Sequence, residues 1–273
     1  MNQLFHFIAK LPSFPGKLTL ANKVFSDENK NYLRRINGGA LLNLNLNDRI
    51  QRRIYIKGVH EPETEAPLLE LAKDSKCFVD IGANVGYFSM MLSQVYPNLE
   101  VHCFEPMPRN IQALKLNKET NKNNINIHEV CLSDENTEVE FAIPPEGECG
   151  WGRIAQGELV KNFENRIKVP ARTLDQMLSQ EVFKSPPDLI KIDVEGNEMR
   201  VLKGAAQLLS KHSPTICIEI NEECLVDNQT TGAEIFNYLK NLGYQAHLLE
   251  NSKLKKINQV DTDYKFLNYF FIK

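Results

Sequence analysis

Apolar runs of strand length alternate with stretches of helical periodicity from Cys77 to the end of the chain. Seven strands are predicted, at Cys77–Ile81, Glu100–Phe104, Ile125–Cys131, Leu189–Asp193, Thr215–Ile220, Gln245–Leu249 and Asn268–Ile272. Four helices are predicted between them, at Val85–Val95, Arg109–Glu119, Glu198–Leu209 and Ala233–Leu242. This order predicts an α/β fold with a mainly parallel sheet covered by helices on both faces. No helical pattern separates the last two strands, so we expect them to pair antiparallel.

One stretch interrupts this alternation between the third and fourth strands. Thr137–Ile143 and Ile167–Arg172 have strand patterns, and the loop-like segment between them contains Trp151, the only tryptophan. Loops at the carboxyl end of an open α/β sheet line its ligand crevice. This insert is therefore a candidate wall of a binding site.

The first 60 residues are less regular and form a predicted N-terminal extension. A β-ribbon is predicted from Ala40–Leu46 and Arg53–Lys57, with turn residues between them. A helix follows, with Pro62 in its first turn. The extension has two open roles, a lid over a site or a contact in a homodimer.

The composition fits a globular enzyme-sized chain. Of its 273 residues, 42% are apolar and 25% are charged, and the net charge is −3. This length suits one good-sized domain, here residues 61–273, with the small extension before it. The net charge gives no reason to expect nucleic acid as a partner. No run of about 18 uncharged apolar residues exists, so no membrane span is predicted.

The N-terminus and the cysteines favour a cytoplasmic protein. The apolar start of the chain lacks a charged leader and a small-residue cleavage site, so we interpret it as part of the fold. No CxxC pair occurs, and zinc-type spacing is missing. Reduced, buried thiols are expected at Cys77, Cys103, Cys131, Cys149, Cys217 and Cys224.

The segment Phe78–Phe88 (FVDIGANVGYF) joins a predicted strand to a predicted helix through a glycine loop. Gly82 and Gly86 permit close backbone approach to a ligand, and Asn84 tolerates a left-handed conformation. Exposed N–H groups at the start of a helix favour an anionic ligand group. Asp80, just before the loop, can attract an ammonium group. The segment therefore predicts a cofactor site.

Glu105 ends the next predicted strand, 23 positions after Gly82. A carboxylate at a spacing of about 20 residues reaches ribose hydroxyls in nucleotide-binding βαβ units. An NAD site would read GxGxxG, whereas here Asn84 replaces the middle glycine that meets the pyrophosphate. S-adenosylmethionine (SAM) has a ribose, a carboxylate and an ammonium group but no phosphate. The loop and Glu105 together favour SAM over NAD.

Five motifs in order resemble the FkbM-type SAM-dependent methyltransferases. They are FVDIGANVGYFS, CFEPMPRNIQALKLN, VCLSDENTEVEF, RTLD and DLIKIDVEGNEMRVLKGA, and the match runs from about Asn43 to Glu219. The resemblance implies a Rossmann-like class I methyltransferase fold, with a seven-stranded sheet whose last strand is antiparallel. It also implies O-methylation, often of a hydroxyl on a sugar, a glycan or a polyketide.

The resemblance further implies which residues bind SAM. The glycine loop would contact its methionine part, Glu105 its ribose, and the Cys131–Asp134 segment its adenine. The cofactor-binding residues expected are Asp80, Gly82, Ala83, Asn84, Gly86, Phe88, Glu105, Pro106, Cys131, Leu132, Ser133 and Asp134.

The strand end IDVEG carries the candidate catalytic groups. Methyl transfer needs an in-line arrangement and a group that removes the hydroxyl proton. The preferred base is Asp193, with Glu195 as second choice, and the resemblance implies that both face the transferring methyl. Lys191 would steer a carboxylate or hold substrate, unless it is a snorkelling lysine at a sheet edge. Glu198 is interpreted as a charge that complements the start of a helix.

A metal-assisted reaction of the catechol type is an alternative. Asp193, Glu219 and Asn221 lie at the ends of two predicted neighbouring strands, and oxygen ligands of this kind suit Mg²⁺. The other interpretation is that Glu219 and Asn221 are ordinary polar groups at a strand end.

The acceptor is expected to be a sugar, a glycan or another small-molecule metabolite. Trp151 and Arg153 can stack on and hydrogen-bond a sugar, or else anchor a packed loop. His60 and Glu61, which precede the helix that begins near Pro62, can cover the cofactor. Two other classes are weighed against this SAM-dependent O-methyltransferase. An RNA methyltransferase would need a basic groove, and a non-catalytic SAM-binding module would not need Asp193.

Overall fold

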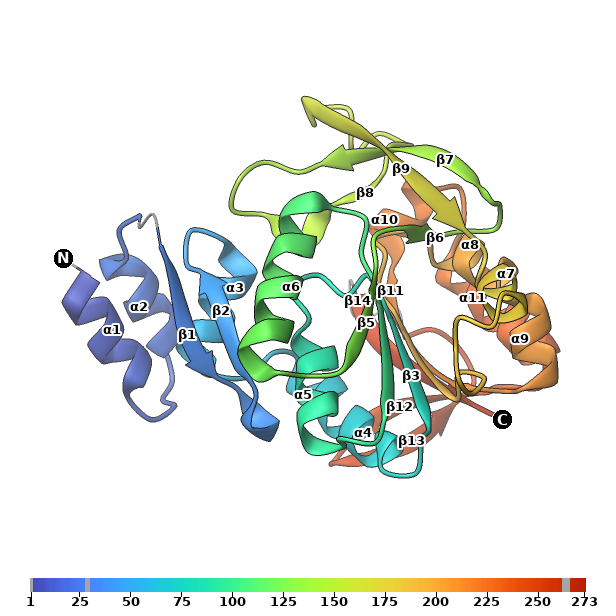
Figure 1. The fold of residues 1–273 in the computed structure, drawn as a ribbon, viewed down its shortest axis with the longest axis horizontal. Helices are drawn as coiled ribbons and strands as arrows, with labels where there is room; N and C mark the ends of the chain where they lie inside the picture. The colour runs from blue at the N-terminus through green and yellow to red at the C-terminus, as the bar shows by residue number, and fades with distance from the viewer. Residues whose placement is uncertain (1, 28–29, 262–265) are drawn as a thin grey trace.

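A mixed sheet of eight strands forms the centre of the computed structural model, which describes residues 2–27, 30–261 and 266–273 (Figure 1). The strand order is β13-β12-β14-β11-β10-β3-β4-β5. The bounds are β3 (Cys77–Ile81), β4 (Glu100–Phe104), β5 (Ile125–His128), β10 (Leu189–Ile192), β11 (Thr215–Asn221), β12 (Gln245–Glu250), β13 (Lys253–Ile257) and β14 (Phe266–Ile272). Strands β5, β4, β3, β10 and β11 are parallel to one another, and β14 is antiparallel to β11 and β12.

The predicted antiparallel pairing of the last two strands is confirmed, and the sheet has one strand more than predicted. The extra strand is β13, which forms a hairpin with β12. Asn251 and Ser252 join them, both with positive φ, as a two-residue hairpin turn requires. The sequence of β13, KLKKI, is charged because the strand lies at the sheet edge, and so it shows no apolar run.

Helices cover both faces of the sheet because the strands are apolar on both faces. Phe78 packs into one core cluster and the next residue, Val79, into the other. Helices α4 (Pro62–Ala72), α5 (Tyr87–Val95) and α6 (Pro108–Asn121) contribute to the first cluster. Helices α7 (Leu174–Ser179), α8 (Glu198–Lys203), α9 (Ala206–Lys211), α10 (Glu222–Asp227) and α11 (Gly232–Asn241) contribute to the second.

The predicted helix Glu198–Leu209 is two helices, α8 and α9. The break follows from a close approach at Gly204, where an added Cβ would lie 2.0 Å from the carbonyl oxygen of Ser133. The predicted strand Ile125–Cys131 is also divided. Its first part is β5 in the main sheet, and its end belongs to a second sheet.

The second sheet is the insert predicted between the third and fourth core strands. It has the order β6-β9-β7-β8, from β6 (Cys131–Leu132), β9 (Asn165–Arg172), β7 (Thr137–Ile143) and β8 (Arg153–Ile154). A short 3-10 turn, η2 (Cys149–Trp151), precedes β8. The insert lies at the top of Figure 1, beside one end of the main sheet.

The N-terminal region packs beside α6, on the left of Figure 1. It contains α1 (Asn2–Lys10), α2 (Lys17–Val24), β1 (Asn31–Arg35), the 3-10 turn η1 (Asn37–Gly39), β2 (Leu41–Asn45) and α3 (Arg49–Lys57). The backbone N–H groups of Leu41 and Asn43 donate to the side chains of Asn121 and Asn117 in α6. Among the described residues, each helix is too short or too polar to cross a bilayer.

The predicted ribbon exists, but its second strand was predicted in the wrong place. Strand β2 pairs with β1, and Arg53–Lys57 lies in α3. The alternation RIYIK imitates a strand, yet the Asp48 side chain caps a helix by accepting from Gln51 N at 3.0 Å. The predicted cysteine state is confirmed, since all six cysteines are buried and free.

Candidate active site

A cleft of about 360 Å³ opens at the carboxyl ends of β3, β4, β10 and β11. The insert and the segment before α4 complete its walls. The predicted site residues that line it are Asp80, Gly82, Ala83, Asn84, Phe88, Glu105, Pro106, Cys131, Leu132, Trp151, His60, Lys191, Asp193, Glu195, Glu219 and Asn221. Four further predicted residues are absent from the lining, namely Gly86, Ser133, Asp134 and Arg153. One wall of the cleft is the insert, as expected.

The glycine loop is shaped by its contact with β10 and β4. Gly82 has φ +82, and an added Cβ would lie 1.9 Å from the carbonyl oxygen of Asp193. The N–H groups of Gly82 and Ala83 donate to Phe104 O at 2.9 and 3.1 Å. Asn84 adopts the left-handed conformation that the sequence predicts, with φ +51. The loop is thus fixed before any ligand binds.

Glu105 is buried beneath this loop and holds it. Its two carboxylate oxygens accept from Asn84 N at 2.8 Å and from Met107 N at 2.9 Å. Burial raises the pKa of Glu105 to about 7, although these N–H donors favour the ionised form. A carboxylate has about four acceptor positions, so two remain for ribose hydroxyls.

Asp80 is buried at the floor of the cleft with one oxygen unpaired. Its Oδ2 accepts from the Ser89 hydroxyl at 2.6 Å, whereas its buried Oδ1 has no hydrogen-bond partner. Burial raises the pKa of Asp80, and the charge of Lys191 opposes this. A buried oxygen without a partner is costly and marks a position for a donor. An ammonium group on a ligand would satisfy it.

Lys191 lies in β10, between β3 and β11, and not at a sheet edge. The interpretation as a snorkelling lysine at a sheet edge is therefore wrong. Its ammonium group donates to Asp193 Oδ2 at 2.8 Å and lies 5.0 Å from the centre of the Phe88 ring. Burial alone would lower the pKa of Lys191, but the charges of Asp193, Glu61 and Asp80 raise it overall. Lys191 therefore carries its charge into the cleft.

Three carboxylates converge beside this lysine. Glu61, Asp193 and Glu219 each have an oxygen within 4.8 Å of the others. Burial would raise the pKa of Asp193, but Lys191 lowers it overall. Burial and the neighbouring charge of Asp193 raise the pKa of Glu219 well above its ordinary value. In this cluster the charged form of Asp193 is therefore favoured, whereas the charged form of Glu219 is disfavoured.

Sequence reasoning gave Glu61 a role beside His60 in covering the cofactor but missed its part in this cluster, because only folding brings it to the strand ends. It precedes α4 with a left-handed φ of +46, and its Oε2 accepts from Asn268 Nδ2 at 3.2 Å. His60 beside it lines the cleft and contacts Tyr87 edge-on, with ring centroids 5.4 Å apart. Burial lowers the pKa of His60, which favours the neutral ring.

Glu195 and Arg153 form a pair behind the cleft wall. Arg153 Nη2 lies 3.2 Å from Glu195 Oε2, and the Arg153 side chain is 1% exposed. Arg153 is therefore behind Glu195 and does not reach the cavity. Burial and the charge of Asp193 raise the pKa of Glu195 to about 7. Glu195 also has φ +56, a conformation that is uncommon outside glycine and often found at functional sites.

Two predicted cofactor residues, Ser133 and Asp134, lie outside the lining of the cleft and bond to neighbouring parts of the chain. Ser133 N donates to Arg172 O, and Asp134 forms an ion pair with Arg200 at 3.0 Å. Glu198 is buried and closes the IDVEG turn, because its Oε1 accepts from Val194 N and Gly196 N. This position at the start of α8 agrees with its interpretation as a helix N-terminal charge.

The sheet order, the glycine loop and the carboxylate after β4 define a Rossmann-like α/β protein of the methyltransferase type. The model of the Methyltransferase FkbM domain matches residues 80–246, more than half of the chain. The chain therefore belongs to the FkbM methyltransferase family. Methyltransferases of this kind use SAM, so the family and the cofactor predicted from the sequence are both confirmed.

Relatives with named reactions agree with a SAM-dependent O-methyltransferase. The 2-O-methyltransferase NoeI of Sinorhizobium fredii is 27% identical over 233 residues, which cover 75% of this chain and 94% of NoeI. The hexuronic acid methyltransferase AglP of Haloferax volcanii is 27% identical over 143 residues, 52% of this chain and 55% of AglP. The crystal structure of methyltransferase FkbM from Methylobacillus flagellatus aligns with a TM-score of 0.48 and 19% identity, over all of this chain and 59% of that one.

Proposed function

We propose that this enzyme transfers the methyl group of SAM to a hydroxyl oxygen of a sugar or a sugar-containing small molecule. One observation carries the proposal. Asp193, which Lys191 keeps ionised, lies in the cleft beside the glycine loop that fits the cofactor. An ionised carboxylate at this place can accept the proton of an acceptor hydroxyl.

The residues around the loop fit SAM. The unpaired Oδ1 of Asp80 suits its ammonium group, and the free acceptor positions of Glu105 suit its ribose hydroxyls. Cys131 and Leu132 line the cleft beyond Glu105, where they would border the adenine. When bound, SAM supplies an electrophilic methyl group on a positively charged sulfur.

The other side of the cleft would hold and activate the acceptor. Asp193 would orient the hydroxyl in line with the methyl group and accept its proton as the new O–CH₃ bond forms. Lys191 would keep Asp193 ionised, and Glu219 beside it lines the same side of the cleft. Glu195 is the second candidate for the base.

Two exposed aromatic residues favour a sugar as the acceptor. Trp151 on η2 and Phe266 at the start of β14 both line the cleft and are 48% and 58% exposed. Aromatic rings so exposed at a cleft can stack on the apolar face of a sugar ring, while carboxylates accept from its hydroxyls. The names of NoeI and AglP agree with such an acceptor.

The N-terminal extension, proposed as residues 1–60, contributes Arg53 and His60 to the cleft.

Calorimetry with SAM, followed by measurement of S-adenosylhomocysteine formed with a panel of sugars, tests this function. We expect SAM to bind and at least one neutral sugar or glycan fragment to be methylated on oxygen. Binding of NAD in place of SAM would contradict the proposed cofactor site. Methylation of nitrogen or carbon acceptors alone would contradict the hydroxyl acceptor.

A metal-assisted version of the reaction is the second candidate, and the cluster of Glu61, Asp193 and Glu219 favours it. Three converging carboxylates are the donor set that Mg²⁺ takes, and Glu61 joins Asp193 and Glu219 of the predicted ligands. The ammonium group of Lys191 competes for Asp193, because it already neutralises that carboxylate. Loss of turnover with EDTA and its recovery with Mg²⁺ would support a metal. Unchanged turnover in EDTA would mean that Asp193 and Lys191 act without a metal ion.

A further inference from the structure

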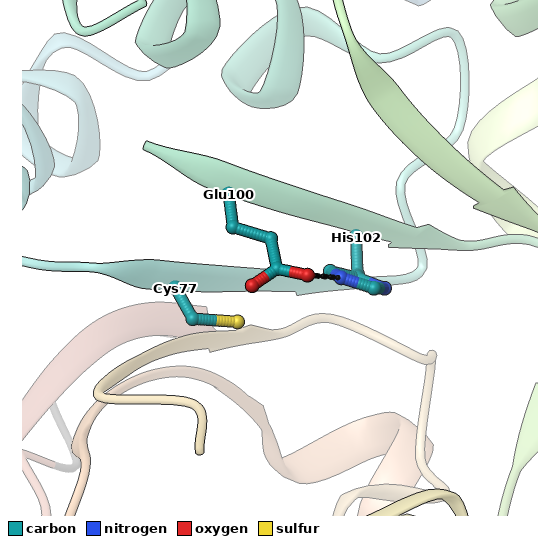
Figure 2. Close-up of side chains that lie close together, drawn as sticks. All are labelled: Cys77, Glu100 and His102. Atoms are coloured by element: carbon teal, nitrogen blue, oxygen red, sulfur yellow. Dashed lines mark hydrogen bonds and ion pairs between the residues drawn. The ribbon is translucent and has the colours of Figure 1, made fainter. Parts of the chain in front are cut away.

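Strand register brings three metal-ligating side chains together at the amino ends of β3 and β4. Cys77 and Glu100 are partners in this parallel pair, and His102 follows Glu100 by two residues. Side chains two positions apart share a face, as do register partners on neighbouring strands. Figure 2 shows the thiol, the carboxylate and the imidazole directed into the same space. One ligand atom of each lies within 4.8 Å of the others.

We propose that Cys77, Glu100 and His102 bind a zinc ion. Thiolate, carboxylate and imidazole are the three ligand types that Zn²⁺ takes in proteins. Bond lengths of about 2.0–2.3 Å place tetrahedral ligands about 3.3–3.8 Å apart, so the side chains need to close by about 1 Å. One thiolate and one carboxylate also neutralise the charge of Zn²⁺, which suits a buried position.

The groups around the cluster hold two of the ligands as a zinc site requires. His102 Nδ1 lies 2.9 Å from His128 Nε2, and the Glu100 carboxylate accepts from Lys184 N at 3.1 Å. Metal-bound histidines donate their second ring N–H to an acceptor. The Nε2 atom of His128 is such an acceptor when the proton of its ring is on Nδ1. His102 Nε2 can therefore ligate zinc while Nδ1–H donates to His128.

Without metal, the same groups form a hydrogen-bond network. His102 Nε2 lies 2.8 Å from Glu100 Oε1, which indicates that Nε2 carries the ring proton there. On zinc binding, the metal displaces the proton from His102 Nε2. The proton between the two histidines moves from His128 Nε2 to His102 Nδ1. His128 takes up a proton on Nδ1 in its place, so the two rings together keep two protons. The Cys77 thiol loses its proton to solvent, so one proton is released for each zinc bound.

An entry path adjoins the cluster. A surface cavity of about 610 Å³ is lined by Glu100, Asn126 and Lys184. It can admit the ion and supply a water as the fourth ligand. The cluster lies at the opposite strand ends from the catalytic cleft, because Cys77 and Glu100 begin the strands that Ile81 and Phe104 end. The zinc would therefore lie outside the catalytic cleft and would link β3 to β4.

Cobalt substitution in the full, reduced chain tests the site. After treatment with a chelator, the protein is titrated with Co²⁺, and we expect a sulfur-to-cobalt charge-transfer band that saturates at one equivalent. Zn²⁺ should remove the band. Cys77→Ser should abolish it, and Cys217→Ser, which changes a buried cysteine in β11, should retain it. The carboxylate cluster in the cleft has no sulfur ligand and cannot produce this band.

A second measurement tests the proposal in case the Cys77→Ser variant does not fold. Saturating Zn²⁺ should raise the melting temperature of the wild-type chain by several degrees, as expected for a ligand that binds only the folded state. The rise should be lost in Glu100→Gln and retained in Glu129→Gln, an exposed control. Absence of a charge-transfer band in the wild-type protein, or a band that persists in Cys77→Ser, would overturn the proposal.

Discussion

Strands β3 and β4 carry polar clusters at both ends, and the two clusters differ in how well their groups are satisfied. At the amino ends, His102 bonds through both ring nitrogens, and the Glu100 carboxylate accepts from a backbone N–H. At the carboxyl ends, Asp80 keeps a buried oxygen without a partner. The comparison indicates which kind of ligand each end of these strands would bind. An organic ligand completes an unsatisfied cleft, whereas a metal ion replaces protons in a network that is already closed.

The two ends also shift pKa values in different ways. Burial lowers the pKa of His102 and of His128 at the amino ends, so both rings are neutral at pH 7. At the carboxyl ends, burial raises the pKa of Glu105 and of Glu195 to about 7. Groups that change charge near neutral pH are therefore found in the cleft and not in the Cys77 cluster.

The largest expected effect is that of Asp193→Asn. If Asp193 accepts the hydroxyl proton, its loss should lower kcat by about 10²–10⁴-fold. SAM affinity should change little, because Asp80 and Glu105 are intact. Turnover is measured as S-adenosylhomocysteine formed at saturating SAM, and affinity by calorimetry.

Asp74→Asn is the control for this variant, because Asp74 is exposed and lies outside the lining of the cleft. It should keep both turnover and SAM affinity. The melting temperature of Asp193→Asn shows whether the unpaired Lys191 unfolds the protein. Wild-type turnover in a folded Asp193→Asn would remove Asp193 from the role of base.

Glu105→Gln should have the next largest effect, this time on the cofactor. Hydrogen bonds to a charged group are worth about 1.5–3 kcal/mol each, so the loss of one ribose contact should weaken SAM binding about 10–100-fold. The amide also places an NH₂ against Asn84 N or Met107 N, which loosens the loop. Calorimetry with SAM gives the affinity, and kcat at saturating SAM should fall far less than in Asp193→Asn.

The exposed Glu129→Gln serves as a control for Glu105→Gln because it also replaces a glutamate by its amide. It should bind SAM like the wild type. Equal SAM affinity in Glu105→Gln and the wild type would contradict the ribose role of Glu105.

The central fold was predictable because it is encoded by local apolar runs. Strands β3, β4, β10 and β11 are buried and nearly uniform in hydrophobicity, so the predicted ranges agree with the observed bounds to within one residue. The exceptions depend on single polar groups. Asp48 caps α3, so the alternating segment Arg53–Lys57 forms a helix. The alternation of apolar and polar positions gives no information about this capping hydrogen bond.

The site was predictable where its residues share one motif. Asp80, the glycine loop and Glu105 follow each other along one βαβ unit, and they meet in the cleft. Glu61 was predicted to cover the cofactor, but its place in the carboxylate cluster was missed because it reaches Asp193 only through the packing of α4. Arg153 was predicted to hold substrate, yet it lies behind Glu195 because strand β8 directs it inward. The Cys77 cluster was missed because chain spacing does not show strand register.

The smallest expected effect is the response of turnover to pH, and it decides between the two candidate bases. Lys191 lowers the pKa of Asp193, so a reaction that uses Asp193 should lose its base only below the ordinary pKa of about 4. The profile of kcat/KM should then change by no more than about twofold between pH 6 and 8. Glu195, with a pKa of about 7, would instead give a tenfold fall for each pH unit below 7.

The variant Glu195→Gln completes this experiment, because it would remove such a fall together with most of the activity. With Asp193 as the base, Glu195→Gln should keep a flat profile and a large part of the turnover. Neither His102 nor His128 can imitate a limb at pH 7, because burial lowers both pKa values. Glu105 also has a pKa of about 7, so the profile is measured at saturating SAM, and a limb near pH 7 that disappears in Glu195→Gln would transfer the role of base from Asp193 to Glu195.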